Sequence, residues 1–171
     1  MQKQTPNQLF QRLSDTVELL DNSSKQLMKI MEDQIDAIIA SDTLKVDALT
    51  EAHTSLSWYY KEHEKQFIYE LTNLLNEVSR GEVENVRLTT LKEYFPEKHA
   101  EVDHWYEVIS ENTKELQRKH KQVLELLEFA MKQNANLMHR MYSKHSEKDT
   151  RYQPSGQRSD VATGVAVNQE I

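Results

Sequence analysis

A regular alternation of three- and four-residue steps between apolar positions dominates the second half of the sequence. It runs from Val102 to Met141, over more than five heptads. Residues spaced in this way lie on one face of an α-helix, so the pattern predicts a long helix with a continuous packing seam. The positions that carry the pattern are Val102, Tyr106, Ile109, Thr113, Leu116, His120, Val123, Leu127, Ala130, Asn134, Leu137 and Met141.

Two earlier segments repeat the same spacing, between Leu9 and Ile38 and between Leu49 and Val78. The first is preceded by Thr5-Pro6-Asn7-Gln8, a run that suits the start of a helix. The Thr5 hydroxyl can accept from the Gln8 amide, the Gln8 side chain can reach back to Thr5, and proline is favoured at the first helical position. The second segment is followed by Gly81, which we expect to adopt the left-handed conformation that ends a helix.

These signals predict an all-α fold, an elongated antiparallel helical bundle or coiled coil of three long helices. The helices are expected at about 6–40, 44–80 and 97–145, with a short helix or packed loop at 82–95. Together they form a helical domain over residues 1–145. Residues 146–171 contain few large apolar side chains and are expected to form a flexible, disordered tail.

The composition excludes several classes of protein. With three glycines in 171 residues, the chain cannot supply the turns of a β-sandwich or the phosphate-binding loops of a dinucleotide-binding fold. Without cysteine it has no disulfide framework and no thiolate ligand. The net charge of −7, with no basic block, argues against nucleic-acid binding. Since no apolar run approaches about 20 residues, we expect no membrane insertion and a cytoplasmic protein.

Catalytic chemistry is not indicated. No Gly-x-Ser-x-Gly element is present, and a di-iron site in a helical bundle needs two Glu-x-x-His pairs, of which the chain has one, Glu101 to His104. His53, His63 and His120 lie on apolar stripes, where semi-buried helix contacts are the simpler interpretation. The aromatic clusters Trp58–Tyr60 and Trp105–Tyr106 are expected to stack in the core. We therefore expect no enzyme, no cofactor and no metal site.

The segment from 124 to 142 carries more apolar width than one packing seam requires. Filling of irregular core gaps would explain its methionines, but the breadth of the surface favours a second neighbour. That neighbour is expected to be a partner protein, since the first two helices are shorter than the third. The residues responsible are Leu124, Leu126, Leu127, Phe129, Ala130, Met131, Leu137, Met138 and Met141.

The sequence resembles the FlgN family of flagellar type III export chaperones. The amphipathic segment from Leu9 to Ile39 and the tight polar turn after it are similar to the family's first helix and turn. Tyr152-Gln-Pro-Ser-Gly156 matches a Tyr-x-x-x-Gly element found after the last helix in many members, and a polar Arg158-Ser159-Asp160 follows it.

The resemblance implies a chaperone that binds the C-terminal helices of hook–filament junction proteins, prevents their premature assembly and delivers them to the export gate. It implies an export-gate contact at Tyr152 and Gly156, with Tyr142 as an open alternative to Tyr152. It also places the cargo site in the C-terminal part of the chain. The cargo-binding candidates are Val123, Leu124, Leu127, Ala130, Met131, Leu137, Met138 and Met141.

Three other interpretations stay open at this point. A homo-oligomeric coiled-coil scaffold would use the same heptads to pair with itself, and a homodimer is compatible with either function. An export chaperone for a different flagellar cargo would share the same general composition. A metal-binding helical enzyme would need ligands that the spacing does not supply. The sequence does not identify the cargo.

Overall fold

The computed structural model describes residues 5–81, 83 and 85–148 of the chain. All regular structure within these residues is helical and they contain no strand, which confirms the all-α prediction. Three helices are long: α1 (Pro6–Ile39), α2 (Thr43–Ser79) and α4 (His99–Lys148). The chain divides into two compact units, unit 1 (Met1–Glu128) and unit 2 (Phe129–Ile171), with the boundary inside α4.

The start of α1 follows its sequence signal. Thr5 is the N-cap, its hydroxyl accepts from the Gln8 amide, and the Gln8 side chain accepts from the Thr5 amide at 2.9 Å. Pro6 occupies the first turn. The predicted capping box is confirmed, and it satisfies two of the backbone N–H groups that a helix start leaves without partners.

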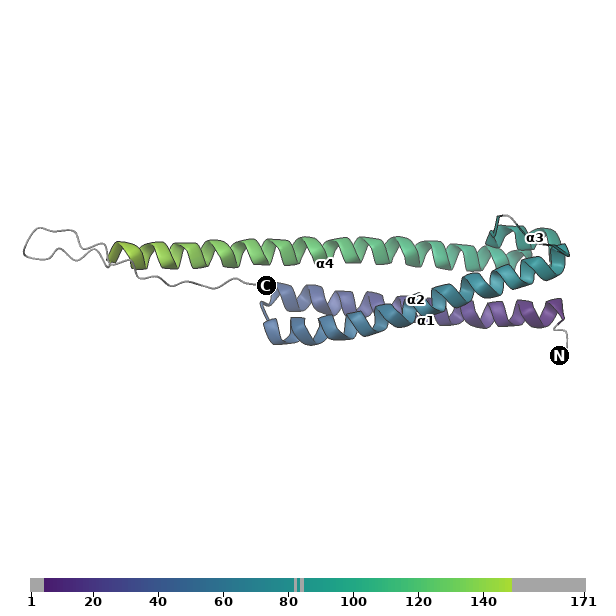
Figure 1. Ribbon diagram of the computed structural model, residues 1–171, viewed down its shortest axis with the longest axis horizontal. Coiled ribbons are helices and arrows are strands. Elements are labelled where there is room, and N and C mark those ends of the chain that lie inside the picture. Colours follow the sequence, from purple (N-terminus) through teal and green to yellow (C-terminus); the bar gives the residue numbers. More distant parts are fainter. Residues whose placement is uncertain (1–4, 82, 84, 149–171) are drawn as a thin grey trace, which may run out of the picture. The chain divides into compact units, whose positions relative to one another are not determined.

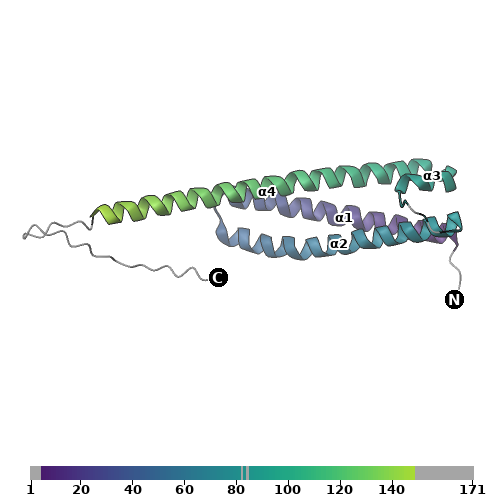
Figure 2. The same ribbon diagram turned by 45° about the horizontal axis from the view of Figure 1, so that its top comes forward.

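A short turn joins α1 to α2, and the two helices lie side by side in opposite directions (Figures 1 and 2). Ser41 adopts a left-handed φ of 55°, and the Asp42 side chain accepts from the Lys45 amide to cap α2. The end of α2 differs from expectation. Arg80, rather than Gly81, takes the left-handed conformation, with a φ of 57°. The helix therefore ends at Ser79, one residue before the end predicted from a left-handed Gly81.

The segment between α2 and α4 contains short helical turns and packed side chains. It includes the 3₁₀ turns Leu88–Thr90 and Pro96–Lys98 on either side of α3 (Leu91–Tyr94). Leu91 is fully buried and Phe95 is 5% exposed. The segment therefore contributes to the core of unit 1 as well as connecting two long helices.

The core of unit 1 is concentrated where α1 begins, α2 ends and α4 begins. Phe10 lies at its centre, with ring centroids 5.0 Å from Phe95 and 4.9 Å from Trp105. The expected stacking of the two aromatic clusters is wrong: Trp105 is buried against Phe10, whereas Trp58 pairs with its neighbour Tyr59 and is 59% exposed. The buried cluster comprises Leu9, Phe10, Leu13, Val17, Leu71, Leu74, Leu75, Leu91, Phe95, Val102 and Trp105.

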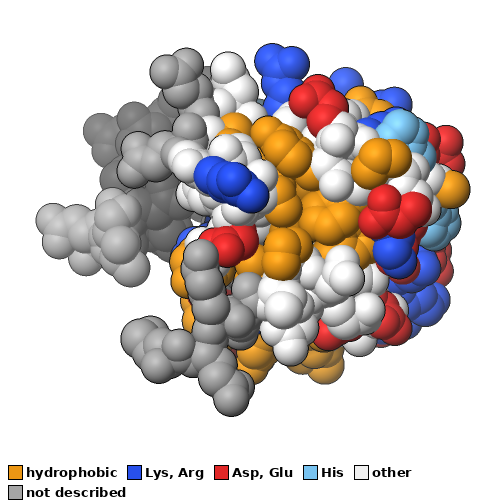
Figure 3. Space-filling model, turned by 90° about the vertical axis from the view of Figure 1, so that its right-hand side faces the viewer, with side chains coloured by type: hydrophobic (Ala, Val, Ile, Leu, Met, Phe, Trp, Pro, Cys, Tyr) orange, Lys and Arg blue, Asp and Glu red, His pale blue; other side chains and the backbone are white. Residues whose placement is uncertain are grey.

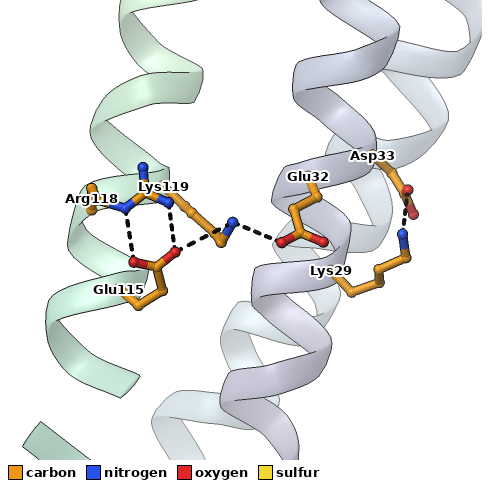
Figure 4. Close-up of polar contacts among 6 residues, drawn as sticks. All are labelled: Lys29, Glu32, Asp33, Glu115, Arg118 and Lys119. Atoms are coloured by element: carbon orange, nitrogen blue, oxygen red, sulfur yellow. Dashed lines mark hydrogen bonds and ion pairs between the residues drawn. The ribbon is translucent and has the colours of Figure 1, made fainter. Parts of the chain in front are cut away.

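Farther along unit 1, polar contacts tie α4 to α1. Asn112 donates to Asp21 at 2.8 Å. Lys119 is 8% exposed, and Figure 4 shows its ammonium between Glu32 of α1, at 2.8 Å, and Glu115 of α4, at 3.4 Å. Arg118 holds Glu115 through two hydrogen bonds, of 2.6 and 2.8 Å. Pairing with two carboxylates offsets the cost of desolvating a lysine ammonium.

Replacing a core leucine of α2 should lower the free energy of unfolding far more than replacing an exposed leucine of the same helix. Leu74 is fully buried and Leu44 is 82% exposed. Because Leu74→Ala leaves a cavity, we expect a loss of about 2–5 kcal/mol, against less than about 0.5 kcal/mol for Leu44→Ala. Urea denaturation followed by circular dichroism measures both values. Equal losses would contradict this description of the core.

Acid should weaken the ion pairs of Glu115 with Arg118 and Lys119 in a defined pH range. The hydrogen bond from Arg118 lowers the pKa of Glu115 to about 2. A carboxylate with a depressed pKa contributes stability above its unfolded pKa, near 4.3, and loses it as the pH falls towards 2. We expect the Glu115 carboxyl carbon to titrate near pH 2 by NMR. Arg118→Gln should raise this pKa, and Lys121→Gln should leave it unchanged.

Candidate functional site

Unit 2 contains a concentration of exposed apolar side chains on α4. Met131 is 71% exposed, Leu137 58%, Met138 55% and Met141 63%, while Ala130 is half-buried. Phe129 and Tyr142, which were not among the cargo-binding candidates, are also exposed. We call the residues from 129 to 142 the unit 2 surface.

The unit 2 surface is broader than a single helix stripe. Ala130, Leu137 and Met141 recur at steps of seven and four residues. The same steps, displaced by one residue, connect Met131, Met138 and Tyr142. Neighbouring residues on a helix differ by about 100° in direction, so the two rows cover adjacent faces. An apolar surface of this breadth marks an interaction site far more often than scattered single apolar residues do.

Three of the predicted cargo-binding residues belong to unit 1, where their environments differ. Leu124 is 53% exposed and Leu127 is half-buried. Val123 is 4% exposed and therefore belongs to the interior of unit 1. The heptad pattern placed Val123 and Leu127 on the same seam, but it could not separate positions that the other helices of unit 1 cover from positions that they leave open.

Unit 1 carries surface hollows that the sequence did not indicate, because each is built by residues from different elements. A groove of about 550 Å³ between α1 and α2 is lined by Ile30, Leu56 and Tyr59, among others. A groove of about 360 Å³ is lined by Phe67, Leu88, Tyr106 and Ile109, among others. Helical periodicity identifies a face of one helix, but it does not identify which faces meet.

A third pocket, of about 690 Å³, lies at the end of unit 1 that contains α3. Pro6, Val78, Tyr94 and Phe95 line it together with the polar side chains of Asn76, Glu77 and Arg80. Figure 3 shows hydrophobic side chains gathered on this end of unit 1. The Asn76 side chain accepts from the Val83 amide at 3.0 Å and so helps to hold the segment after α2.

Three of the histidines, His53, His63 and His120, make contacts between helices. His53 Nδ1 lies 2.9 Å from Gln34 Oε1, and the rings of His53 and His120 are 6.2 Å apart. Burial, and to a smaller extent His120, lowers the pKa of His53. His63 Nδ1 lies 3.2 Å from the Ser23 hydroxyl. In the part of the chain that the structure describes, no three His, Asp or Glu side chains converge as metal ligands.

Two further observations concern the remaining predictions. No helix within residues 5–81 and 85–148 is both long enough and apolar enough to cross a membrane. Tyr152 and Gly156, the residues predicted to contact the export gate, lie outside the described residues.

Comparison with known proteins identifies the family. No curated protein and no solved structure shows significant similarity to the chain. The family model described as FlgN protein matches residues 1–160, nearly the whole sequence. The match confirms the predicted resemblance to this family. The chain therefore belongs to the FlgN family, a family of flagellar export chaperones.

Proposed function

We propose that this protein binds the C-terminal helices of hook–filament junction proteins in the cytoplasm, prevents their premature assembly and delivers them to the export gate. Membership of the FlgN family supports this function. The observation that carries the proposal is the unit 2 surface, where large apolar side chains remain more than half exposed on a helix. The function is non-enzymatic and needs no cofactor.

The unit 2 surface suits the capture of an amphipathic helix. Each Leu or Met side chain that is fully buried on binding contributes about 1.5–3 kcal/mol, and the cost of association offsets part of that gain. Methionine is flexible and polarizable, so Met131, Met138 and Met141 can adapt to helices of different sequence. A surface of this kind can bind more than one cargo helix and still release it.

Residues of unit 1 can add a smaller number of apolar contacts to the bound cargo helix. Leu124 is exposed and offers an apolar contact of its own, and Leu127 is half-buried. We assign the principal role to Leu137, Met138 and Met141, because each of these side chains is more than half exposed.

We further propose that residues 1–145 form the helical chaperone domain, an antiparallel bundle of three long helices, and that residues 146–171 form a docking tail. The matched family model reaches residue 160 and so includes Tyr152 and Gly156. In this division, cargo binding and gate docking use different residues. A tail that becomes ordered on contact lowers the affinity of docking, which suits a transient handover.

The cargo-binding proposal predicts that a charge on the unit 2 surface weakens capture. We expect Leu137→Glu to reduce affinity for the C-terminal segment of a hook–filament junction protein at least tenfold, because binding would bury a carboxylate without a partner. Leu44→Glu is the matched control, since Leu44 is 82% exposed on another helix. Isothermal titration calorimetry with the full-length chain measures both affinities.

Tyr152→Ala separates the two proposed activities. It should leave cargo affinity unchanged and abolish co-purification with the export-gate protein. Binding that is confined to a filament or cap protein would replace the proposed cargo. Failure of the wild-type protein to bind any of these segments would refute the chaperone mechanism proposed for the unit 2 surface.

A further inference from the structure

A second exposed surface lies on α2, within unit 1, and the proposed function does not use it. Trp58 is 59% exposed and Tyr69 is 61% exposed. Glu62 and Lys65 lie between them, and their side chains are 42% and 72% exposed. The four positions follow steps of four, three and four residues, so they share one helix face. We call Trp58, Glu62, Lys65 and Tyr69 the α2 stripe.

The α2 stripe faces away from the core of unit 1. The next residues along the helix that are fully buried, Glu70, Leu71, Leu74 and Leu75, occupy other directions. Tyr59 and Ile68, which are 54% and 53% exposed, border the stripe on either side. Trp and Tyr are enriched among the residues that dominate protein–protein binding energies.

The order of side chains in the α2 stripe is self-complementary. Read from either end, it is an aromatic residue, two charged residues of opposite sign and an aromatic residue. In an antiparallel pair of identical helices centred between Glu62 and Lys65, each Trp58 lies opposite Tyr69 of the second copy. Each Glu62 then lies opposite Lys65 of the second copy. We propose that a second copy of the chain docks on the α2 stripe and forms an antiparallel, two-fold symmetric dimer.

Charge complementarity selects this arrangement. A parallel pair in register would place Lys65 against Lys65 and Glu62 against Glu62, which is unfavourable at both positions. In one copy, Lys65 already donates to Glu62 at 2.7 Å within the helix. The antiparallel dimer keeps every charge paired, since each carboxylate meets a second ammonium across the interface.

The surface available is sufficient for a modest interface. An exposed large apolar side chain presents on the order of 100 Å². Trp58, Tyr59, Ile68 and Tyr69 of each copy, eight side chains in the dimer, therefore supply on the order of 800 Å². The neighbouring polar side chains bring the total near the lower limit of about 1,000 Å² for a specific interface. The dimer should therefore be concentration-dependent.

Charge exchange tests the pairing. Glu62→Lys and Lys65→Glu should each weaken dimerisation of the full-length chain at least tenfold in analytical ultracentrifugation, because like charges then face each other. An equimolar mixture of the two variants should restore the dimer, since every pair across the interface regains opposite signs. Lys121→Glu alters an exposed pair on α4 and serves as the matched control. Circular dichroism verifies that each variant remains folded.

Cysteine cross-linking tests the register. The natural sequence has no cysteine, so an introduced thiol is unique. Ser55 and Thr72 extend the stripe by three residues at each end and face each other across the proposed dimer. Ser55→Cys mixed with Thr72→Cys should yield a disulfide-linked dimer on mild oxidation. Each variant alone should not, because identical positions would lie about 25 Å apart along the helices.

The outcomes distinguish this proposal from cargo binding. A wild-type chain that stays monomeric at several hundred micromolar overturns the dimer. A dimer that is insensitive to both charge variants but lost in Leu137→Glu places the contact on the unit 2 surface and also overturns the proposal. Cross-linking of Ser55→Cys with itself excludes the antiparallel register. Cargo affinity measured in Lys65→Glu should equal that of the wild type in either case.

Discussion

The fold of unit 1 depends on the burial of one continuous face of α1. The residues that bury it run the length of the helix, from Leu9 and Phe10 near its start to Ala37 and Ile38 near its end. Part of this face contacts α2, and another part receives α4 through Phe10 and Trp105. Outside the buried face, the exposed Glu32 of α1 pairs with Lys119 of α4. The buried face of α1 is therefore shared between two helix–helix interfaces.

Local signals in the sequence identified the helices well. The capping box at Thr5 and the heptad spacing act over three to seven residues, so they can be recognised without knowledge of the tertiary structure. Contacts between distant residues could not be predicted in this way. Lys119 and Glu32 are 87 positions apart, and nothing in either local sequence specifies the other. The same limit explains why the prediction that Trp58 stacks in the core was wrong. Helical periodicity alone did not show which aromatic residues would meet.

The candidate site was predictable in part for a similar reason. Surplus apolar width on one helix is a local property, so the breadth of the segment from 124 to 142 was visible in the sequence. Whether a position is covered depends on the other helices, and this is why Val123 is buried while Leu124 is exposed. The self-complementary order of the α2 stripe is also local. It became informative only when the structure placed Trp58 and Tyr69 on an outer face.

The short turn between α1 and α2 has a consequence for the order of folding. Contacts near this turn join residues close in sequence, such as Gln34 and Thr50, whereas Asn112 reaches Asp21 across 91 residues. Closing a short loop costs less chain entropy and is faster than closing a long one. The α1–α2 hairpin is therefore expected to form early during synthesis, before α4 has left the ribosome. Until α4 docks, the nascent chain exposes the part of α1 that α4 will cover. During that interval the exposed apolar side chains of α1 are open to contact with other proteins, as those of an export cargo are before a chaperone binds them.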